Sequence, residues 1–207
     1  MPRSRKLRTV SEASGTTDFA REPRMLEMAF LAGRGHYHEV IARLSEAQHS
    51  VWIATANLKE LMVEGPRRSA RSRSRYRSVL DELDELAARG VELRLLHAGP
   101  PSRAFRRSFD RHRGLIEGGL ELRQCPRVHF KTVIIDAQSC YLGSANWTGA
   151  GLGAKGSGRR NFELGFLSRD EQLIDEVQAM YAAIWSGSQC SGCTLREDGC
   201  EAPLDLF

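Results

Sequence analysis

Short blocks of apolar residues alternate with polar ones along this chain, and their spacing predicts two kinds of secondary structure. Between residues 36 and 47 the apolar positions recur three and four residues apart, which is the spacing of one face of an α-helix. The runs at 51–56, 91–97 and 128–135 are apolar at both odd and even positions, as expected for strands that are covered on both faces. The chain therefore combines amphipathic helices with buried strands.

The order of these elements predicts the fold class. Seven strands are expected, at residues 25–32, 50–56, 91–97, 120–124, 128–136, 139–143 and 162–167. Four helices are expected, at residues 36–47, 78–88, 103–116 and 170–185. Strands that alternate with helices predict an α/β fold with a mixed central β-sheet of about seven strands and helices on both faces.

The composition changes along the chain and suggests three parts. Residues 1–24 are rich in Arg, Ser and Thr, which predicts a disordered basic arm. Residues 25–186 hold the predicted strands and helices and form one domain, in which 57–77 lose the apolar periodicity and are predicted to be an arginine-rich insertion loop. Residues 187–207 are expected to form a polar tail that contains cysteines.

The overall composition is that of an ordinary globular domain. The chain has 207 residues, of which 27% are charged and 41% hydrophobic, with a net charge of +4. No apolar run approaches the ~18 residues that a membrane-spanning helix needs. The first residues hold no apolar core of a secretory signal, so we expect a cytoplasmic location.

Polar side chains that could take part in catalysis or binding are concentrated between residues 129 and 163. Side chains two positions apart on a strand point to the same face, so polar residues at this spacing lie together. On the last predicted strand Phe162, Leu164 and Phe166 point the other way, and we expect them to face the core. Three polar pairs could form one cluster on adjacent strands: His129 with Lys131, Ser144 with Asn146, and Asn161 with Glu163.

The stretch from His129 to Asn146 reads H-x-K-x4-D-x6-G-S-x-N and occurs once. It resembles the HKD signature of the phospholipase D superfamily of phosphodiesterases, and Asn161-Phe162-Glu163 is similar to the Asn-x-Glu that often follows it. The resemblance implies a phospholipase D/nuclease-like fold and catalysis without a cofactor or metal. It also implies that Asp136 belongs to the catalytic motif without binding phosphate directly.

The residue types suit the cleavage of a phosphodiester bond. An imidazole such as that of His129 can attack phosphorus and form a covalent phosphohistidine. Lys131 supplies a compact positive charge, and Glu163 is expected to hold the far ring nitrogen of His129. The residues expected to bind the phosphate are Lys131, Ser144, Asn146 and Asn161. Trp147, which follows this motif, is expected to pack in the core.

One histidine cannot attack phosphorus and also protonate the leaving oxygen on the opposite side. The resemblance implies that two motif copies build each site, as in single-motif members such as the small bacterial endonucleases and the mitochondrial cardiolipin hydrolase and nuclease. The other five histidines are not followed by lysine two positions later, so no second copy is present. We therefore expect a symmetric homodimer with one composite site.

The motif leaves the substrate open, because a lipid headgroup and a nucleic acid present the same phosphodiester. Arginines cluster in the predicted loop and on the predicted helix 103–116, and such residues could bind a nucleic-acid backbone. A phospholipase would instead show an apolar lip, for which the sequence offers only a short candidate near Leu58. We expect a nuclease; a phospholipase and a non-catalytic nucleic-acid-binding module are the alternatives. The expected groove arginines are Arg67, Arg68, Arg71, Arg73, Arg75 and Arg77, with Arg103, Arg106, Arg107, Arg111 and Arg113 on the helix.

The five cysteines do not have the number or spacing of a disulfide scaffold. Cys125 and Cys140 lie in strand-like segments and are expected to be inert core residues. Cys190, Cys193 and Cys200 have the spacing C-x2-C-x6-C, which is a weak candidate for a metal site because a zinc site usually has four ligands. Free thiols, a disulfide and a metal all remain open for these three residues.

Overall fold

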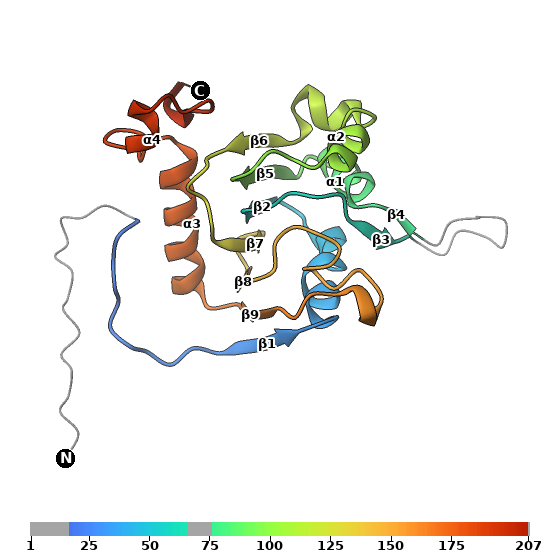
Figure 1. Ribbon diagram of the computed structural model, residues 1–207. Coiled ribbons are helices and arrows are strands. Elements are labelled where there is room, and N and C mark those ends of the chain that lie inside the picture. Colours follow the sequence, from blue (N-terminus) through green and yellow to red (C-terminus); the bar gives the residue numbers. More distant parts are fainter. Residues whose placement is uncertain (1–16, 66–75, 207) are drawn as a thin grey trace, which may run out of the picture.

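A computed structural model describes residues 17–65 and 76–206, and its centre is one mixed β-sheet (Figure 1). The seven strands lie in the order β1-β9-β8-β7-β2-β5-β6. Strands β2, β5 and β6 are parallel to one another, and the other neighbours are antiparallel. The predicted α/β class with a mixed seven-stranded sheet is confirmed. The strands are β1 (Met28–Ala32), β2 (Ser50–Thr55), β5 (Glu92–His97), β6 (Glu121–Gln124), β7 (Lys131–Ile135), β8 (Ser139–Gly143) and β9 (Leu164–Ser168).

The helices begin at polar residues that cap them. Ser78 caps α1, with Asp81 completing a capping box, and Ser102 and Asp170 accept hydrogen bonds from the first turns of α2 and α3. The α-helices are α1 (Val79–Ala88), α2 (Arg103–Phe109), α3 (Glu171–Trp185) and α4 (Thr194–Glu197). Shorter helical turns lie at Tyr37–Ile41, Leu44–Glu46, Leu115–Gly119, Ser157–Arg159 and Leu204–Leu206. No helix in the described ranges is long and apolar enough to cross a membrane.

Helices cover both faces of the sheet, and each face has its own core. On one face, the helical segment 37–46 and α1 pack over residues such as Ile53, Val133 and Tyr141. On the other face, α3 packs over β2, β7 and β8 through Ile174 and Tyr181. Figure 1 shows α3 on one side of the sheet and α1 and α2 on the other.

Two predicted helices are shorter or less regular than expected. The segment 36–47 buries its apolar face as predicted, but it forms a wide turn at Tyr37–Ile41 and a tight one at Leu44–Glu46. The predicted helix 103–116 ends at Phe109, because the ring of His112 binds the carbonyl of Ser108 at 2.8 Å and the chain tightens into a turn. Leu115–Gly119 then forms a separate helical turn.

The expectation that Phe162, Leu164 and Phe166 face the core is wrong. Their exposed fractions are 107%, 58% and 43%. On the neighbouring strand Phe30 is also exposed, and its ring centre lies 5.4 Å from that of Phe166. Leu164 and Phe166 share a face of β9, which is left uncovered at the β1–β9 end of the sheet, and Phe162 is exposed just before this strand.

The regions expected to be an arm, a loop and a tail differ in what the structure shows. Residues 1–16 and 66–75 lie outside the described residues. Residues 17–24, the described part of the predicted arm, form no helix or strand, but they are not free, because Arg21 binds Glu176 of α3 and Arg24 binds Asp170. The predicted insertion contains a hairpin of β3 (Met62–Glu64) and β4 (Tyr76–Ser78). The tail is more structured than expected, because it contains α4 and buries Leu204 against α3.

Candidate active site

The polar residues of the motif lie at the ends of three adjacent strands, and only Lys131 lies within a strand. His129 precedes β7, Ser144 and Asn146 follow β8, and Asn161 and Glu163 precede β9. β7 pairs with β8 and β8 with β9, so that Lys131 lies opposite Gly143 and Gly143 lies opposite Gly165. A β-carbon at Gly143 would lie 2.2 Å from the hydroxyl of Tyr141, and one at Gly165 would lie 2.4 Å from its ring. These glycines therefore make room for the Tyr141 ring under the site, which is a packing reason that the sequence did not reveal.

His129 and Lys131 lie together at the start of β7. The ammonium of Lys131 lies 3.2 Å from Nδ1 and 3.5 Å from Nε2 of His129, and it also binds the His129 carbonyl. His129 is exposed, whereas Lys131 is only 7% exposed. Burial lowers the pKa of Lys131, and the negative charge of Glu163 opposes this lowering. An exposed imidazole beside a buried cation is suited to receive an anion.

The residues on either side of His129 anchor its backbone. Val128 is buried and Phe130 is half-buried, and both pack in the cluster that contains Tyr181 of α3. The side chain of His129 therefore points away from this core towards solvent.

Glu163 is held by the other polar residues of the cluster. Its carboxylate accepts hydrogen bonds from the Ser144 hydroxyl and from Nδ2 of Asn161, the latter at 3.1 Å. Its backbone carbonyl lies 3.2 Å from Nε2 of the buried His36. The expected hydrogen bond from His129 to Glu163 is not formed among the described residues. In this structure Glu163 acts on the site through its charge near Lys131 and by orienting Ser144 and Asn161.

Asn146 is fixed by residues that the sequence did not single out. Its Oδ1 accepts hydrogen bonds from the backbone N–H of Asn57 at 3.0 Å and from the Thr55 hydroxyl at 3.3 Å. A backbone N–H can bind only the oxygen of the amide group, so this contact sets which way the amide is turned and directs its NH2 group away. In the sequence, the only indication of residues that could hold Asn146 was the polar pair Thr55 and Asn57 at the end of the predicted strand 50–56.

The segment after Asn146 is tied to the same loop. The N–H of Trp147 donates to the Thr55 hydroxyl at 2.9 Å, and its carbonyl accepts from Lys59 at 2.9 Å. Trp147 is buried, which confirms that it packs in the core. The end of β2 and the Ser144–Trp147 segment therefore form one rigid unit.

Asp136 lies at the other end of β7 from His129. Its carboxylate accepts hydrogen bonds from the N–H groups of Gln48, His49 and Ser50 at 2.9, 2.7 and 2.9 Å. Burial acts to raise the pKa of Asp136, but these three donors outweigh it and the pKa lies below its ordinary value. The side chain holds the start of β2 against the end of β7.

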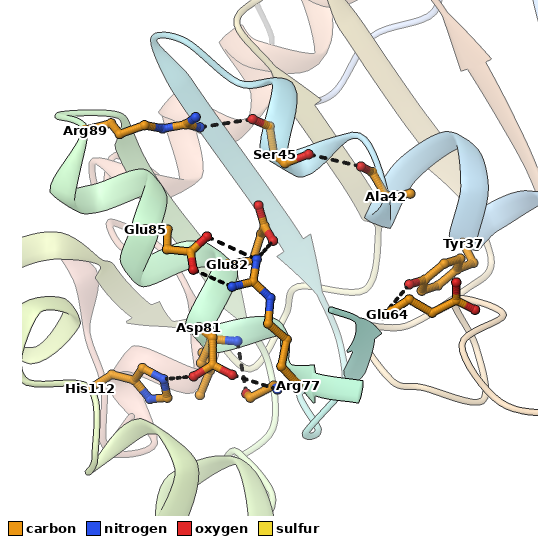
Figure 2. A network of polar contacts seen from close by, with 12 residues as sticks. Tyr37, Ala42, Ser45, Glu64, Arg77, Asp81, Glu82, Glu85, Arg89 and His112 are labelled. Carbon is orange, nitrogen blue, oxygen red and sulfur yellow. Dashed lines mark hydrogen bonds and ion pairs between the residues drawn. The ribbon is translucent and has the colours of Figure 1, made fainter. Parts of the chain in front are cut away.

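The described part of the arginine-rich segment is not a free basic surface. Figure 2 shows that the guanidinium of Arg77 is bound by Glu82 and Glu85 of α1, and its pKa is raised chiefly by the hydrogen bond to Glu85. The other five predicted groove arginines of this segment, Arg67, Arg68, Arg71, Arg73 and Arg75, lie outside the described residues. Arg77 is therefore occupied within its own chain.

The exposed arginines of α2 lie nearer to the site. Ser102, which caps α2, donates its N–H to the carbonyl of Leu58 at 2.9 Å, and Leu58 follows the residue that binds Asn146. Arg103, Arg106 and Arg107 are exposed on this helix. They could contact a substrate that extends beyond the site, as could Arg127, Arg159 and Arg160, which lie close in sequence to His129 and Asn161.

Similarity to known proteins agrees with this arrangement. The family described as "Cardiolipin synthase, PLD-like domain" matches residues 40–185, which is well over half of the chain. No protein with a curated description matches the sequence significantly.

Several solved structures share the fold at low sequence identity. Nuc of Salmonella typhimurium, described as a phospholipase D family member, is 16% identical with a TM-score of 0.55, over 77% of this chain and 95% of that one. NucT of Helicobacter pylori is 15% identical with a TM-score of 0.53, over 76% and 94%. Phosphatidylserine synthase of Haemophilus influenzae is 18% identical with a TM-score of 0.50, over 77% and 38%. Because the family match spans every motif residue from His129 to Glu163, this chain belongs to the phospholipase D superfamily and is an enzyme of that superfamily.

Proposed function

We propose that this enzyme is an endonuclease that cleaves phosphodiester bonds of nucleic acid through a phosphohistidine at His129. The observation that carries the proposal is the pair formed by the exposed His129 and the buried Lys131, whose ammonium lies 3.2 Å from the ring. Lys131 would hold a phosphate oxygen while the imidazole attacks phosphorus. The amide of Asn146, turned by Asn57, would donate a second hydrogen bond to the phosphate.

The reaction needs two histidines in two steps. In the first step a ring nitrogen of His129 bonds to phosphorus, and the leaving oxygen departs with a proton from a second imidazole. In the second step that imidazole takes a proton from water, and the water oxygen displaces the ring nitrogen from phosphorus. Both histidines return to their starting states. A second copy of the chain would supply the second imidazole as its own His129.

An exposed apolar patch supports pairing with a second copy. The patch consists of Met28, Phe30, Phe162, Leu164 and Phe166, on β1, on β9 and just before β9. Glu163 lies between two of these residues, so the patch adjoins the site. Patches of this kind on a globular protein mark contact surfaces. A two-fold axis near the site would bury the patch of each copy and bring the two His129 side chains together.

A mixed dimer tests the composite site. Chains with different tags are co-expressed, one intact and one with His129→Asn, and the mixed dimer is isolated through both tags. A composite site predicts loss of at least a hundredfold of activity in the mixed dimer, whereas independent sites predict half of the activity. A matched control carries His49→Asn, because His49 is exposed beside Asp136 at the other end of β7. A fully active monomer would refute the dimer.

The exposed arginines of α2 support nucleic acid as the substrate. Nucleic acids bind mainly through phosphate contacts with such side chains, so binding should weaken as salt increases. The enzyme would be incubated with labelled single-stranded DNA, with RNA, and with vesicles of cardiolipin and phosphatidylcholine. Nucleotide products that are lost with His129→Asn would support a nuclease. Binding of nucleic acid without cleavage would instead indicate a binding module.

The apolar patch also favours a second candidate, a phospholipase or phospholipid transferase. The sequence showed no apolar lip of useful size, but the structure has one beside the site, formed around Phe162 and Leu164. A related fold occurs in phosphatidylserine synthase. Release of a lipid headgroup or of phosphatidic acid from the vesicles, without nucleotide products, would decide for this candidate.

A further inference from the structure

Four of the five cysteines line one cavity, although they are far apart in the sequence. The cavity measures about 200 Å3 and lies where the tail folds back beside the end of α3. Its wall includes the three tail cysteines, Cys190, Cys193 and Cys200, and also Cys125, which precedes β7. Cys125 was expected to be an inert strand residue, but it lies in a turn outside the strands. The fold therefore brings a fourth thiol, that of Cys125, to the three cysteines of the tail.

The backbone around the cavity brings the thiols to its wall. The N–H of Cys190 binds the carbonyl of Gly187 at 2.8 Å, and the N–H of Cys193 binds the carbonyl of Cys190 at 3.1 Å. Consecutive turns thus place Cys190 and Cys193 together. Gly187 has a positive φ of 75°, and a β-carbon there would lie 2.4 Å from the backbone nitrogen of Asp205. The tail is therefore held in a defined path against α3.

We propose that Cys125, Cys190, Cys193 and Cys200 together form a four-thiolate site for a metal centre. Thiolates are soft ligands that select zinc or iron–sulfur clusters over hard cations such as magnesium and calcium. The spacing of two residues between Cys190 and Cys193 is common to ligand pairs of both types of centre. Arg127 lines the same cavity and places a positive charge beside these thiols.

The volume of the cavity that the four cysteines line favours an iron–sulfur cluster over a single zinc ion. A zinc ion needs all four sulfur atoms at about 2.3 Å from one point. As they stand, no three of the described cysteine, histidine, aspartate and glutamate side chains are grouped to hold a metal ion, so the thiols would have to turn towards a bound centre. A cluster holds each thiolate on a different iron, so its ligands stand further apart, and the cavity of about 200 Å3 that these four cysteines help to line leaves space between them.

The metal centre would hold the segment that leads to the catalytic histidine. The N–H of Cys125 binds the carbonyl of His97 at 2.8 Å, and the N–H of Val128 binds the carbonyl of Cys125 at 3.0 Å. This turn ends next to His129. A metal centre bound both to Cys125 and to the tail cysteines would link this turn to the tail and hold the turn in place. The inference concerns metal binding and does not depend on the proposed nuclease activity.

The test measures the metal content of the full-length protein, purified without oxygen. Iron and zinc are measured by mass spectrometry, sulfide is measured chemically, and visible absorption reports an iron–sulfur chromophore. We expect iron with a matching amount of sulfide, and at least a tenfold loss of both in Cys125→Ser and in Cys193→Ser. Cys140→Ala is the matched control, because Cys140 is buried beneath α3 in a different cluster. It should keep its full metal content.

Each outcome decides a separate part of the proposal. A content of one zinc per chain, lost in both serine variants, would support the four-thiolate site. It would also identify the bound metal as zinc and rule out the iron–sulfur cluster. Wild-type protein that holds no metal, even after incubation with iron and sulfide or with zinc, would overturn the site, and so would disulfides that join these cysteines. Because these measurements are made on the wild type, they hold even if a variant fails to fold. Metal that is fully retained in Cys125→Ser would remove Cys125 from the site.

Discussion

Replacing Asp136 with asparagine separates a structural role of this motif residue from a catalytic one. The carboxylate accepts three backbone N–H groups at 2.7–2.9 Å, from Gln48, His49 and Ser50. Asparagine keeps one acceptor oxygen but turns an NH2 group towards the remaining donors. We therefore expect the fold to lose stability while the chemistry at the other end of β7 is preserved.

The size of the loss follows from the number of hydrogen bonds and their exposure. A hydrogen bond to a charged acceptor contributes about 1.5–3 kcal/mol. Asp136 is only half-buried, so water replaces part of what is lost, and we expect a decrease of about 2 kcal/mol in the free energy of unfolding. For a chain of this size such a loss lowers the melting temperature by about 4–8 °C.

The pH dependence gives the prediction a second signature. The pKa of Asp136 is lower in the folded protein than in the unfolded chain, where it is about 3.9. Its stabilisation is therefore fully present above pH ~4 and is lost as the pH falls through the folded-state pKa. The stability difference between the wild type and Asp136→Asn should be complete at neutral pH and should shrink in acid.

Urea unfolding, followed by circular dichroism from neutral pH down to about pH 3, measures this difference. The control is Asp175→Asn, because Asp175 is exposed on α3, and this variant should unfold like the wild type. Phosphodiesterase activity is measured on the folded fraction. An Asp136→Asn variant with unchanged stability and a hundredfold lower kcat would refute the reasoning and place the carboxylate in the reaction.

Three further predictions test the packing, the anchor of Asn146 and the basic surface. Gly165→Ala should cost about 1–3 kcal/mol of stability in a thermal melt, because the added carbon overlaps the Tyr141 ring. Thr55→Val leaves the N–H of Trp147 unpaired and removes one of the two hydrogen bonds to the Asn146 amide, so the protein should lose about 1–3 kcal/mol and kcat should fall more than KM rises. Arg106→Ala should weaken nucleic-acid binding and lower the slope of log K against log salt concentration by about one. Arg77→Ala should change stability by under ~1 kcal/mol and leave nucleic-acid binding unchanged, because Arg77 is paired with Glu82 and Glu85.

The sheet and the polar cluster could be predicted because both follow from local spacing. The alternation of side chains on a strand suggested pairing His129 with Lys131 and Asn161 with Glu163, and both pairs are in contact although only Lys131 lies within a strand. The register of β7, β8 and β9 then brings the pairs together. The fold class follows from the same pattern, because strands that are apolar at both odd and even positions need other elements packed on both faces of the sheet.

The exposed stripe on β9 shows where this reasoning stops. Spacing places Phe162, Leu164 and Phe166 on one face, but it cannot show what covers that face. α3 covers the sheet at Ile134 and Cys140 and leaves the β1–β9 end open. A stripe buried under a helix and one buried between two copies have the same sequence pattern, so only the fold separates a core from a contact surface.

The contacts that give the site its rigidity join residues that local spacing cannot connect. Asn57 is 89 positions from Asn146, whose amide it turns, and Cys125 meets the tail only because the chain folds back past α3. In the sequence each of these residues looked unremarkable, since a single asparagine or cysteine has no partner within reach. In the proposed mechanism the motif supplies the reacting groups, while more distant residues determine how firmly they are held. Variants at Thr55 and Cys125 should for this reason alter the reaction without removing any group that takes part in it.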